Sequence, residues 1–290
     1  MTKRITKASV IPLRHHDDAR TSSAQDRLNL AERKAREAWA AGGSKRGRLA
    51  KEALAISADC TEAYMALATT SSDWQARVKL YRKAVDAGER VLGSDWKSKF
   101  AGSFWEEIET RPLMRAIASL ANALRWEDEL DEARDLYREL LMRNPTDQQE
   151  IRYELASVLL EAQEYSELDK LLAKYKDDRG AAIMYTKALY AFAKDGGSTE
   201  AEEALRLALE ANHHVPLFLP GILETPTDKP ATFLAGSEEE AIVYSWDNSF
   251  LWLDVPGAGK WLAQAIQKSD KYAKFDRALF EEIVEELKAE

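Results

Sequence analysis

The stretch IASLANALRWEDELDEARDLYRELLMRNPTD, residues 117–147, predicts two amphipathic helices joined by a short turn. Its apolar residues recur at spacings of three and four, which is the period of one helix face. Pro145 follows the second run and stops it, because proline lacks the amide hydrogen that a helix needs. The side chains expected to face inward are Ile117, Leu120, Ala121 and Leu124 in the first helix, and Ala133, Tyr137 and Leu140 in the second.

Further copies of this pattern occur along the chain. One spans residues 152–172, another spans 185–208, and an upstream copy, three residues shorter between its helices, spans 64–84. Residues 28–39 and 53–58 are interpreted as the two helices of a still earlier copy. A helix–turn–helix unit repeated about every 34 residues is typical of the tetratricopeptide repeat. The sequence therefore predicts an all-α fold, a tetratricopeptide-type solenoid of helical hairpins with a helical C-terminal cap.

Three segments are expected along the chain. Residues 1–22 are predicted to be a mobile basic arm, and residues 23–216 the repeat array, interrupted by an inserted segment at 95–112. The first helix of the array is expected to begin near Ser23. Residues 217–290 are interpreted as a cap, because the exposed end of a solenoid needs a terminal unit with a polar outer face.

The predicted cap contains three helices. Ser237 is followed by three glutamates, which favour a helix N-terminus, and that helix is expected to run to about residue 253. Two more helices are expected over residues 258–267 and 270–288. Three tryptophans are expected to bury the inner face of the cap: Trp246, Trp252 and Trp261.

The composition indicates a folded protein outside the membrane. The 290 residues include only 13 glycines and 8 prolines, too few for an all-β fold with many turns. No apolar run reaches about 18 residues, and the N-terminus has no apolar stretch of signal-peptide length. The single cysteine, Cys60, fits a reducing compartment. We therefore expect a cytoplasmic protein with no membrane partner.

The net charge of −9 is unevenly distributed. Residues 1–50 hold 12 Lys or Arg and 5 Asp or Glu, so their balance is +7 against an acidic remainder. The basic arm is either simply solvated or docks onto an acidic surface or nucleic acid. The acidity of the chain as a whole argues against broad nucleic-acid binding, since phosphate contacts require clustered cations.

Two blocks of the sequence resemble known repeat proteins. FWEEIETRPLMRA, residues 104–116, with the following LLMRNPTDQQEIRYELASVLLE, resembles a bacterial tetratricopeptide family with an FWG…ETRPYMR signature. ALAISADCTEAYMALA, residues 53–68, followed by YRKAVDAGERVLG, is similar to the suppressor-of-tumorigenicity-seven family. The resemblance covers roughly residues 50–262. It implies a helical repeat fold and a role in protein interaction, and it implies no reaction.

The signature segment allows a structural and a functional interpretation. Phe104 and Trp105 either plug the core of the repeats or form a partner-binding aromatic pair. Thr110 is expected to cap the following helix, and Pro112 is tolerated in its first turn. Glu107 lies four residues before Arg111 and can form an ion pair with it. The acidic group also includes Glu106 and Glu109; acid–base catalysis there is the minor alternative, because no pocket or second partner is identifiable.

No motif predicts a metal site, a cofactor or catalysis. The histidines occur as two adjacent pairs, His15-His16 and His213-His214, without the spacing of a metal site. The sequence VPGAGKWL, residues 255–262, lacks the spacer and the hydroxyl residue of a phosphate-binding loop, and it predicts a helix start instead. We therefore expect no catalytic residue, no metal and no cofactor.

The predicted partner site is the concave groove of the array, which the first helix of each repeat would line. Arginine and aromatic residues there favour binding of an extended peptide with an acidic or C-terminal group, although an ordinary polar wall is the alternative. The main hypothesis is a non-catalytic scaffold that binds a protein or peptide. The alternatives are a self-assembling, homo-oligomeric subunit and a regulator that contacts nucleic acid through its arm. The expected groove residues are Arg115, Asn122, Arg125, Trp126, Tyr153 and Tyr190.

Overall fold

The computed structural model describes residues 16–219 and 223–272, and every regular element within them is a helix. These residues form fourteen α-helices and two short 3-10 helices, and they contain no strand. The predicted all-α class is therefore confirmed. The chain divides into two compact units, Met1–Gln148 and Gln149–Glu290, called unit 1 and unit 2 below. The division falls in the turn between two predicted copies of the repeat.

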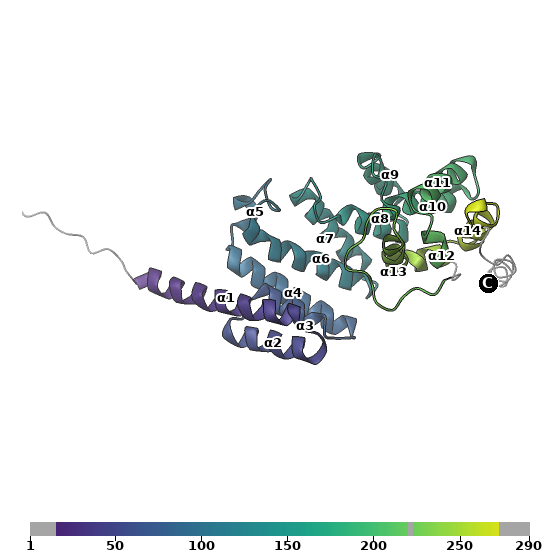
Figure 1. Ribbon diagram of the computed structural model, residues 1–290. Coiled ribbons are helices and arrows are strands. Elements are labelled where there is room, and N and C mark those ends of the chain that lie inside the picture. Colours follow the sequence, from purple (N-terminus) through teal and green to yellow (C-terminus); the bar gives the residue numbers. More distant parts are fainter. Residues whose placement is uncertain (1–15, 220–222, 273–290) are drawn as a thin grey trace, which may run out of the picture. The chain divides into compact units, whose positions relative to one another are not determined.

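Unit 1 is built from consecutive helix pairs (Figure 1). Helix α1 packs on α2, α3 packs on α4, and α6 packs on α7. Successive pairs also contact one another, through α1 with α3, α2 with α3, α3 with α6, and α4 with α6. The bounds are α1(His16–Ala40), α2(Gly43–Ile56), α3(Thr61–Ala68), α4(Trp74–Leu92), α5(Trp96–Lys99), η1(Ile108–Thr110), α6(Arg111–Arg125) and α7(Leu130–Arg143).

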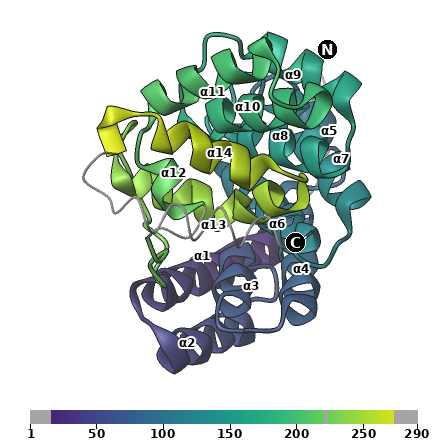
Figure 2. The same ribbon diagram turned by 90° about the vertical axis from the view of Figure 1, so that its right-hand side faces the viewer.

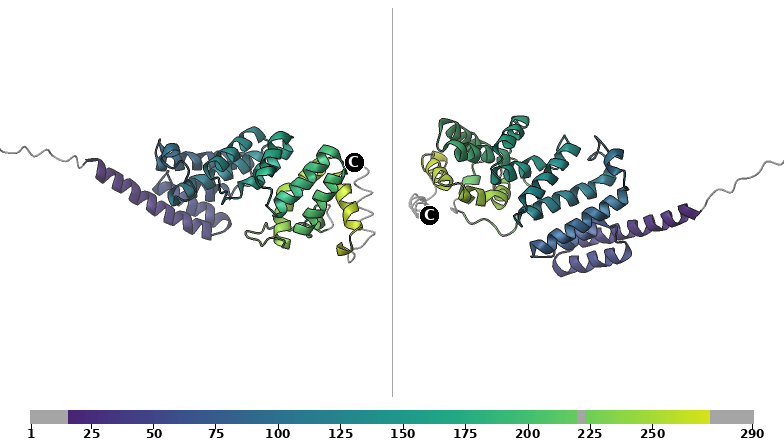
Figure 3. Two further views of the ribbon diagram at one scale, coloured as in Figure 1. Left: turned by 90° about the horizontal axis from the view of Figure 1, so that it is seen from above. Right: turned by 180° about the vertical axis from the view of Figure 1, so that it is seen from behind.

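Unit 2 continues with pairs of the same kind, visible in Figure 2 and from two further directions in Figure 3. Helix α8 packs on α9 and α10 on α11, while α10 also contacts α8, α13 and α14. The bounds are α8(Ile151–Glu161), α9(Tyr165–Lys174), α10(Ala181–Asp195), α11(Thr199–Ala211), α12(Val215–Phe218), α13(Glu238–Asp254), α14(Ala258–Gln267) and η2(Asp270–Tyr272).

The side chains that the sequence predicts to face inward form the core. All seven side chains predicted to face inward between residues 117 and 147 are buried. Small residues are buried where helices cross, so that two backbones can approach closely. Gly88 of α4 is the tightest example in unit 1, because a Cβ atom there would lie 3.1 Å from the side chain of Leu113 in α6.

Local signals in the sequence set several helix ends. The Ser237 side chain accepts a hydrogen bond from the Glu240 amide at 3.2 Å, so it caps α13 as predicted. Helix α7 ends at Arg143, two residues before Pro145. Helix α14 has the predicted bounds, 258–267, and begins after Gly257 at φ +83°, a conformation that favours glycine.

Other boundaries differ from the prediction. Helix α1 begins at His16, not near Ser23, so part of the predicted mobile arm is helical. The part of α1 before Ser23 is polar and acidic, so its sequence shows no helical spacing of apolar residues. Acidic residues in the first turn nevertheless favour a helix. The rest of the arm, including His15, lies outside the described residues. Of the helix predicted over 270–288, only the 3-10 turn η2 lies within the described residues.

The predicted tryptophan cluster is only partly right. Trp252 and Trp261 are buried, and their rings stack at 6.4 Å. Trp246 is 39% exposed instead, and its indole nitrogen donates a hydrogen bond to the Pro226 carbonyl at 2.9 Å. Trp246 therefore holds a loop against the outside of α13 rather than filling the core.

Replacing Gly88 by alanine tests the α4–α6 crossing. We expect Gly88→Ala to lower the unfolding free energy by about 1 kcal/mol or more, because the added methyl group is forced against Leu113. The matched control is Gly47→Ala in α2, where a Cβ atom would meet Thr70 at an ordinary 3.5 Å. That change is expected to stabilise by up to about 1 kcal/mol, since alanine favours a helix interior. Urea unfolding of both variants measures this, and equal effects would contradict it.

Candidate functional site

A groove of about 880 Å³ in unit 1 is the main candidate site. Its first wall is one face of α1, where the lining residues recur at spacings of three and four. The first and the last of these residues are 14 residues apart in the sequence, which at a rise of about 1.5 Å per residue makes the wall about 21 Å long. The residues of this wall are Gln25, Leu28, Glu32, Arg36 and Trp39.

The floor and the second wall come from later segments of unit 1. Helix α3 supplies Thr61, Glu62 and Met65, and α6 supplies Leu113 and Arg115. The opposite wall is formed by the C-terminal end of α4 and by the inserted segment, residues 95–112. Its residues are Gly88, Val91, Leu92, Lys99, Ile108, Glu109 and Pro112.

Glu62 is the polar centre of the groove. It accepts a hydrogen bond from the indole nitrogen of Trp39 at 3.0 Å and forms an ion pair with Arg115. One carboxylate thereby connects α1, α3 and α6 across the floor.

Most other charges of the groove are balanced within unit 1. Asp59 accepts from Arg90 at 2.7 Å, and Lys99 lies 4.0 Å from Glu109. Glu32 and Arg36, one turn apart on α1, make no hydrogen bond or ion pair among the described residues. The lining as a whole is therefore close to neutral.

Three of the exposed apolar side chains of unit 1 gather in the groove. Trp39 is 36% exposed, Val91 is 44% exposed and Ile108 is 74% exposed, and all three line the groove. Exposed apolar residues gathered in one concave surface and rimmed by charges indicate a docking site. The sequence interpretation missed these three residues as site residues. The period of α1 could have shown Trp39, whereas Val91 and Ile108 meet only through the tertiary fold.

Of the four predicted groove residues in unit 1, Arg115 lines the groove. Asn122 accepts a hydrogen bond from the Tyr137 hydroxyl, and Arg125 is buried. Trp126 is 44% exposed and stacks on Trp74, their ring centres 5.8 Å apart. These three residues lie outside the lining of the groove.

The other two predicted groove residues belong to unit 2. Tyr190 is buried, and its hydroxyl donates to Asp169 at 2.9 Å. The Tyr153 hydroxyl lies 3.0 Å from an Asp178 oxygen, and the Arg152 side chain donates to the same carboxylate at 2.6 Å. That all six residues line one continuous groove stays a prediction.

The approach of Tyr153 requires glycine at position 180. A Cβ atom on Gly180 would lie 2.6 Å from the Tyr153 hydroxyl oxygen. Burial raises the pKa of Tyr153 well above its ordinary value. Burial opposes ionisation of Asp178, but the Gly180 amide, Arg152 and Tyr153 together hold the pKa of this carboxyl below its usual range.

Lowering the pH tests the role of Asp178. Because its pKa is lower in the folded chain than the ordinary value of about 3.9, its contribution to stability is present above about pH 4 and is lost as the pH falls through the folded pKa. We expect the difference in unfolding free energy between the wild-type chain and Asp178→Asn to be constant above about pH 5 and to shrink below about pH 4. Denaturant unfolding across this range measures it. A difference that stays unchanged down to about pH 2 would contradict the lowered pKa.

The signature segment holds its aromatic residues in different ways. Phe104 is buried, with its ring edge-on to Trp96 at 5.5 Å. Trp105 is only partly buried, and the Arg111 guanidinium lies 5.3 Å from the centre of its ring. Phe104 therefore fills the core as the first interpretation held, whereas Trp105 lies at the surface of the segment.

Three other expectations for this segment can be compared with the structure. Pro112 lies in the first turn of α6, as predicted. Thr110 occupies the N-cap position, but its hydroxyl does not cap the helix; it lies against the carbonyls of Phe104 and Glu107. The reason is that η1 leads directly into α6, so Thr110 itself has helical backbone angles. The Arg111 side chain donates to the Trp105 carbonyl at 2.8 Å, and the expected Glu107–Arg111 pair does not form within the described part of the chain.

Removing the Thr110 hydroxyl tests the segment. We expect Thr110→Val to lower the unfolding free energy by about 1–3 kcal/mol, because the hydroxyl is buried and its carbonyl partners would lose a donor. Thr110→Ser keeps the donor and is the control. Thermal melting followed by circular dichroism measures both, and a valine variant as stable as the serine variant would contradict the assignment.

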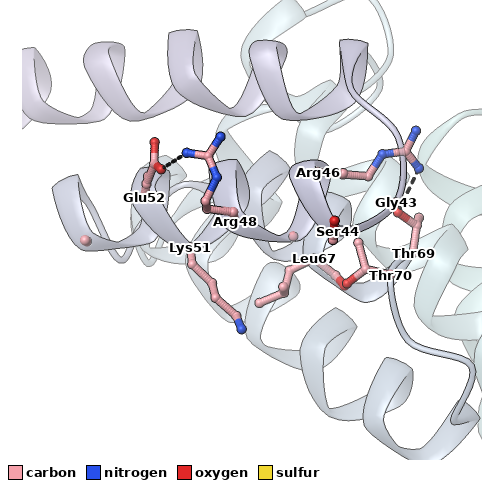
Figure 4. Close-up of a pocket in the computed structure, with 11 residues that line it drawn as sticks. Gly43, Ser44, Arg46, Arg48, Lys51, Glu52, Leu67, Thr69 and Thr70 are labelled. Carbon is pink, nitrogen blue, oxygen red and sulfur yellow. Dashed lines mark hydrogen bonds and ion pairs between the residues drawn. The ribbon is translucent and has the colours of Figure 1, made fainter.

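A second concave surface of about 940 Å³ lies between α2 and the end of α3 (Figure 4). Figure 4 shows Arg46 turned toward Thr69 and Arg48 turned toward Glu52. The first pair is a hydrogen bond of 3.1 Å and the second an ion pair of 2.5 Å. Two of the three cations of this surface are thus engaged within unit 1, and the apolar groove is the better candidate.

The remaining motifs give no further site. Among the described residues, no group of three histidine, cysteine, aspartate or glutamate side chains is placed to hold a metal ion. The rings of His213 and His214 contact each other at 4.1 Å. Burial raises the pKa of the Cys60 thiol to about 11.

None of the helices in the described ranges has both the length and the apolar character needed to cross a membrane.

Comparison with known proteins places the chain in a family. A family model described as ST7 protein matches residues 16–275. "Suppressor of tumorigenicity 7 protein-like" of Rattus norvegicus is 30% identical over 237 residues, which cover 73% of this chain and 42% of the relative. "Protein ST7 homolog" of Drosophila melanogaster is 29% identical over 240 residues, covering 74% and 44%. The chain thus spans about two fifths of the length of these relatives. The resemblance to the suppressor-of-tumorigenicity-seven family, which residues 53–68 carry, is confirmed, and the chain belongs to the ST7 protein family.

Proposed function

We propose that this chain is a non-catalytic scaffold that binds a segment of a partner protein in the unit 1 groove. The observation that carries the proposal is the gathering of Trp39, Val91 and Ile108, all partly exposed, in one concave surface. Exposed apolar side chains that gather in one concave surface are a feature of protein-binding sites, and a partner would cover them. The proposal includes a tetratricopeptide-type solenoid with a helical C-terminal cap, working in the cytoplasm.

The packing of the helices supports this repeat arrangement. Helices α1, α3 and α6 are the first members of three consecutive pairs, and α1 contacts α3 while α3 contacts α6. In such an array the first helices line the concave side, which accounts for their contribution to the groove. The family match agrees with a repeat protein but names no partner.

The binding energy in this groove should come mainly from apolar contacts. The charges there are largely balanced by Arg115, Arg90 and Lys99, so a partner gains little from long-range attraction. Arg115 and Trp39 remain at the centre as residue types that carry much of the energy of interfaces. A groove formed by packed helices is already ordered, so the partner segment alone loses conformational freedom on binding.

Replacing Ile108 tests the groove. We expect Ile108→Ser to lower affinity for a captured partner at least about tenfold while leaving the melting temperature almost unchanged, because Ile108 is 74% exposed. Met142→Ser is the matched control, since Met142 is 69% exposed and lies on α7, outside the groove. The readout is affinity capture from source cells with quantitative mass spectrometry, followed by a binding titration with the captured protein.

Salt provides the second arm of this experiment. Capture should survive a rise from about 0.1 M to about 1 M salt, although the screening length then falls from about 10 Å to about 3 Å. Equal capture by both variants would overturn the groove assignment. Capture of a second copy of the chain through the groove would favour self-assembly instead.

A further inference from the structure

Two charged side chains of the unit 1 groove are left over when the ion pairs of its lining are assigned. Seven charged side chains line the groove, and five of them form ion pairs within unit 1. The other two, Glu32 and Arg36 of α1, make no hydrogen bond or ion pair among the described residues. The five paired side chains are Asp59, Glu62, Lys99, Glu109 and Arg115.

Glu32 and Arg36 lie one turn apart on the α1 wall of the groove. At this spacing two opposite charges can pair with each other, but these two side chains do not. Glu32 is partly buried and Arg36 is exposed. Because four residues of a helix rise about 6 Å, a segment lying along α1 meets a negative and then a positive charge about 6 Å apart.

Apolar side chains lie on both sides of this charge pair. Leu28 comes four residues before Glu32, and Trp39 comes three residues after Arg36, and both line the groove. The α1 wall therefore presents one lining residue per turn, with apolar residues outside and opposite charges between them. A complementary surface needs the same order: apolar contacts at two ends and two opposite charges in the middle.

The polar groups of the groove favour a helix over an extended segment as its occupant. A buried extended segment needs partners for its backbone amides and carbonyls. The described residues contain no strand whose edge could supply them, and most charged side chains of the groove are already paired. A helix forms its backbone hydrogen bonds internally, and its side chains recur once per turn, as the lining residues of α1 do.

We propose that the groove receives an amphipathic helix of a partner protein, and that Glu32 and Arg36 determine which helix it accepts. The accepted helix has an apolar stripe, with a basic residue opposite Glu32 and an acidic residue one turn away opposite Arg36. Apolar contacts supply most of the affinity, while the two charges fix the register and reject helices with the opposite order. This inference rests on the proposed function, because it names the partner of the same groove.

The test selects peptides on the full chain. A phage-displayed library of random 16-residue peptides is panned on the wild-type chain and on Ile108→Ser, and the bound phage are sequenced. A helix of 16 residues is about 24 Å long, enough to span the α1 wall. Peptides enriched only on the wild-type chain should carry apolar residues at spacings of three and four, with a basic and an acidic residue one turn apart.

A charge swap shows whether Glu32 and Arg36 make this selection. The groove swap, Glu32→Arg with Arg36→Glu, keeps the net charge and should enrich peptides with the opposite order of the two charges. The control swap, Arg48→Glu with Glu52→Arg, exchanges an ion pair of α2 that does not line the groove, and it should enrich the wild-type order.

Fluorescence anisotropy with synthetic peptides gives the size of the effect. The best wild-type peptide should bind the groove swap at least about threefold more weakly, and exchanging the two charges of the peptide should restore most of that loss. The charge-exchanged peptide should also bind the wild-type chain at least about threefold more weakly. This last comparison needs no variant, so it decides the matter even if the groove swap fails to fold.

The outcomes separate this inference from the proposed function. Groove-dependent peptides whose apolar residues alternate, or whose charges can be exchanged without effect, would overturn the inference and leave the proposed function standing. Enrichment of the same charge order by a folded groove swap would do the same. If every enriched peptide binds Ile108→Ser as well as it binds the wild-type chain, the proposed function fails and the inference fails with it.

Discussion

Packed pairs of helices can share a core only where the side chains at their crossings are small enough for the two backbones to approach closely. The rest of unit 1 depends on this close approach of its helices. Ala31 and Ala35 of α1 pack in one buried cluster with Ala53 of α2 and Ala63 of α3. At the next crossing, Gly88 leaves just enough room for Leu113. Because α4 is held this close to α6, its C-terminal end lies beside the signature segment, and the two together form one wall of the groove. The site is thus a consequence of helix spacing as much as of its own residues.

The signature segment connects the core to the surface. Phe104 and Thr110 are buried, and the Thr110 hydroxyl lies against the backbone of the turn between them. That buried frame presents Ile108, which is largely exposed, to the groove. The groove of unit 1 therefore combines exposed apolar side chains with charges that are largely balanced.

Periodicity and local signals predicted most helices, because a buried face and a capping residue are both visible in the sequence; the Ser237 cap and the span 258–267 are examples. What depends on tertiary contacts could not be predicted in the same way. Trp246 and Trp252 are both tryptophans of the same predicted helix, but the Trp246 indole donates a hydrogen bond to the Pro226 carbonyl of a loop. Thr110 precedes a helix, as a capping residue does, but its hydroxyl donates to the carbonyl of Glu107, which lies before it in the chain. The same contrast between local signals and tertiary contacts applies to the residues of the groove. Arg115 lines the groove and was found by counting along a helix, whereas Val91 and Ile108 come from a helix end and a 3-10 turn that only the fold brings together.

The measurement that tests the central claim most directly is photo-cross-linking in the source cell. The photoreactive amino acid p-benzoylphenylalanine would replace Val91 inside the groove in one chain and Leu30 of α1 outside the groove in another. The two positions are matched, since Val91 is 44% exposed and Leu30 is 45% exposed. Docking in the groove predicts a discrete adduct with another protein from position 91, with the cross-linked peptide identifiable by mass spectrometry, and no such adduct from position 30. The same adducts from both positions, or none from position 91, would contradict it.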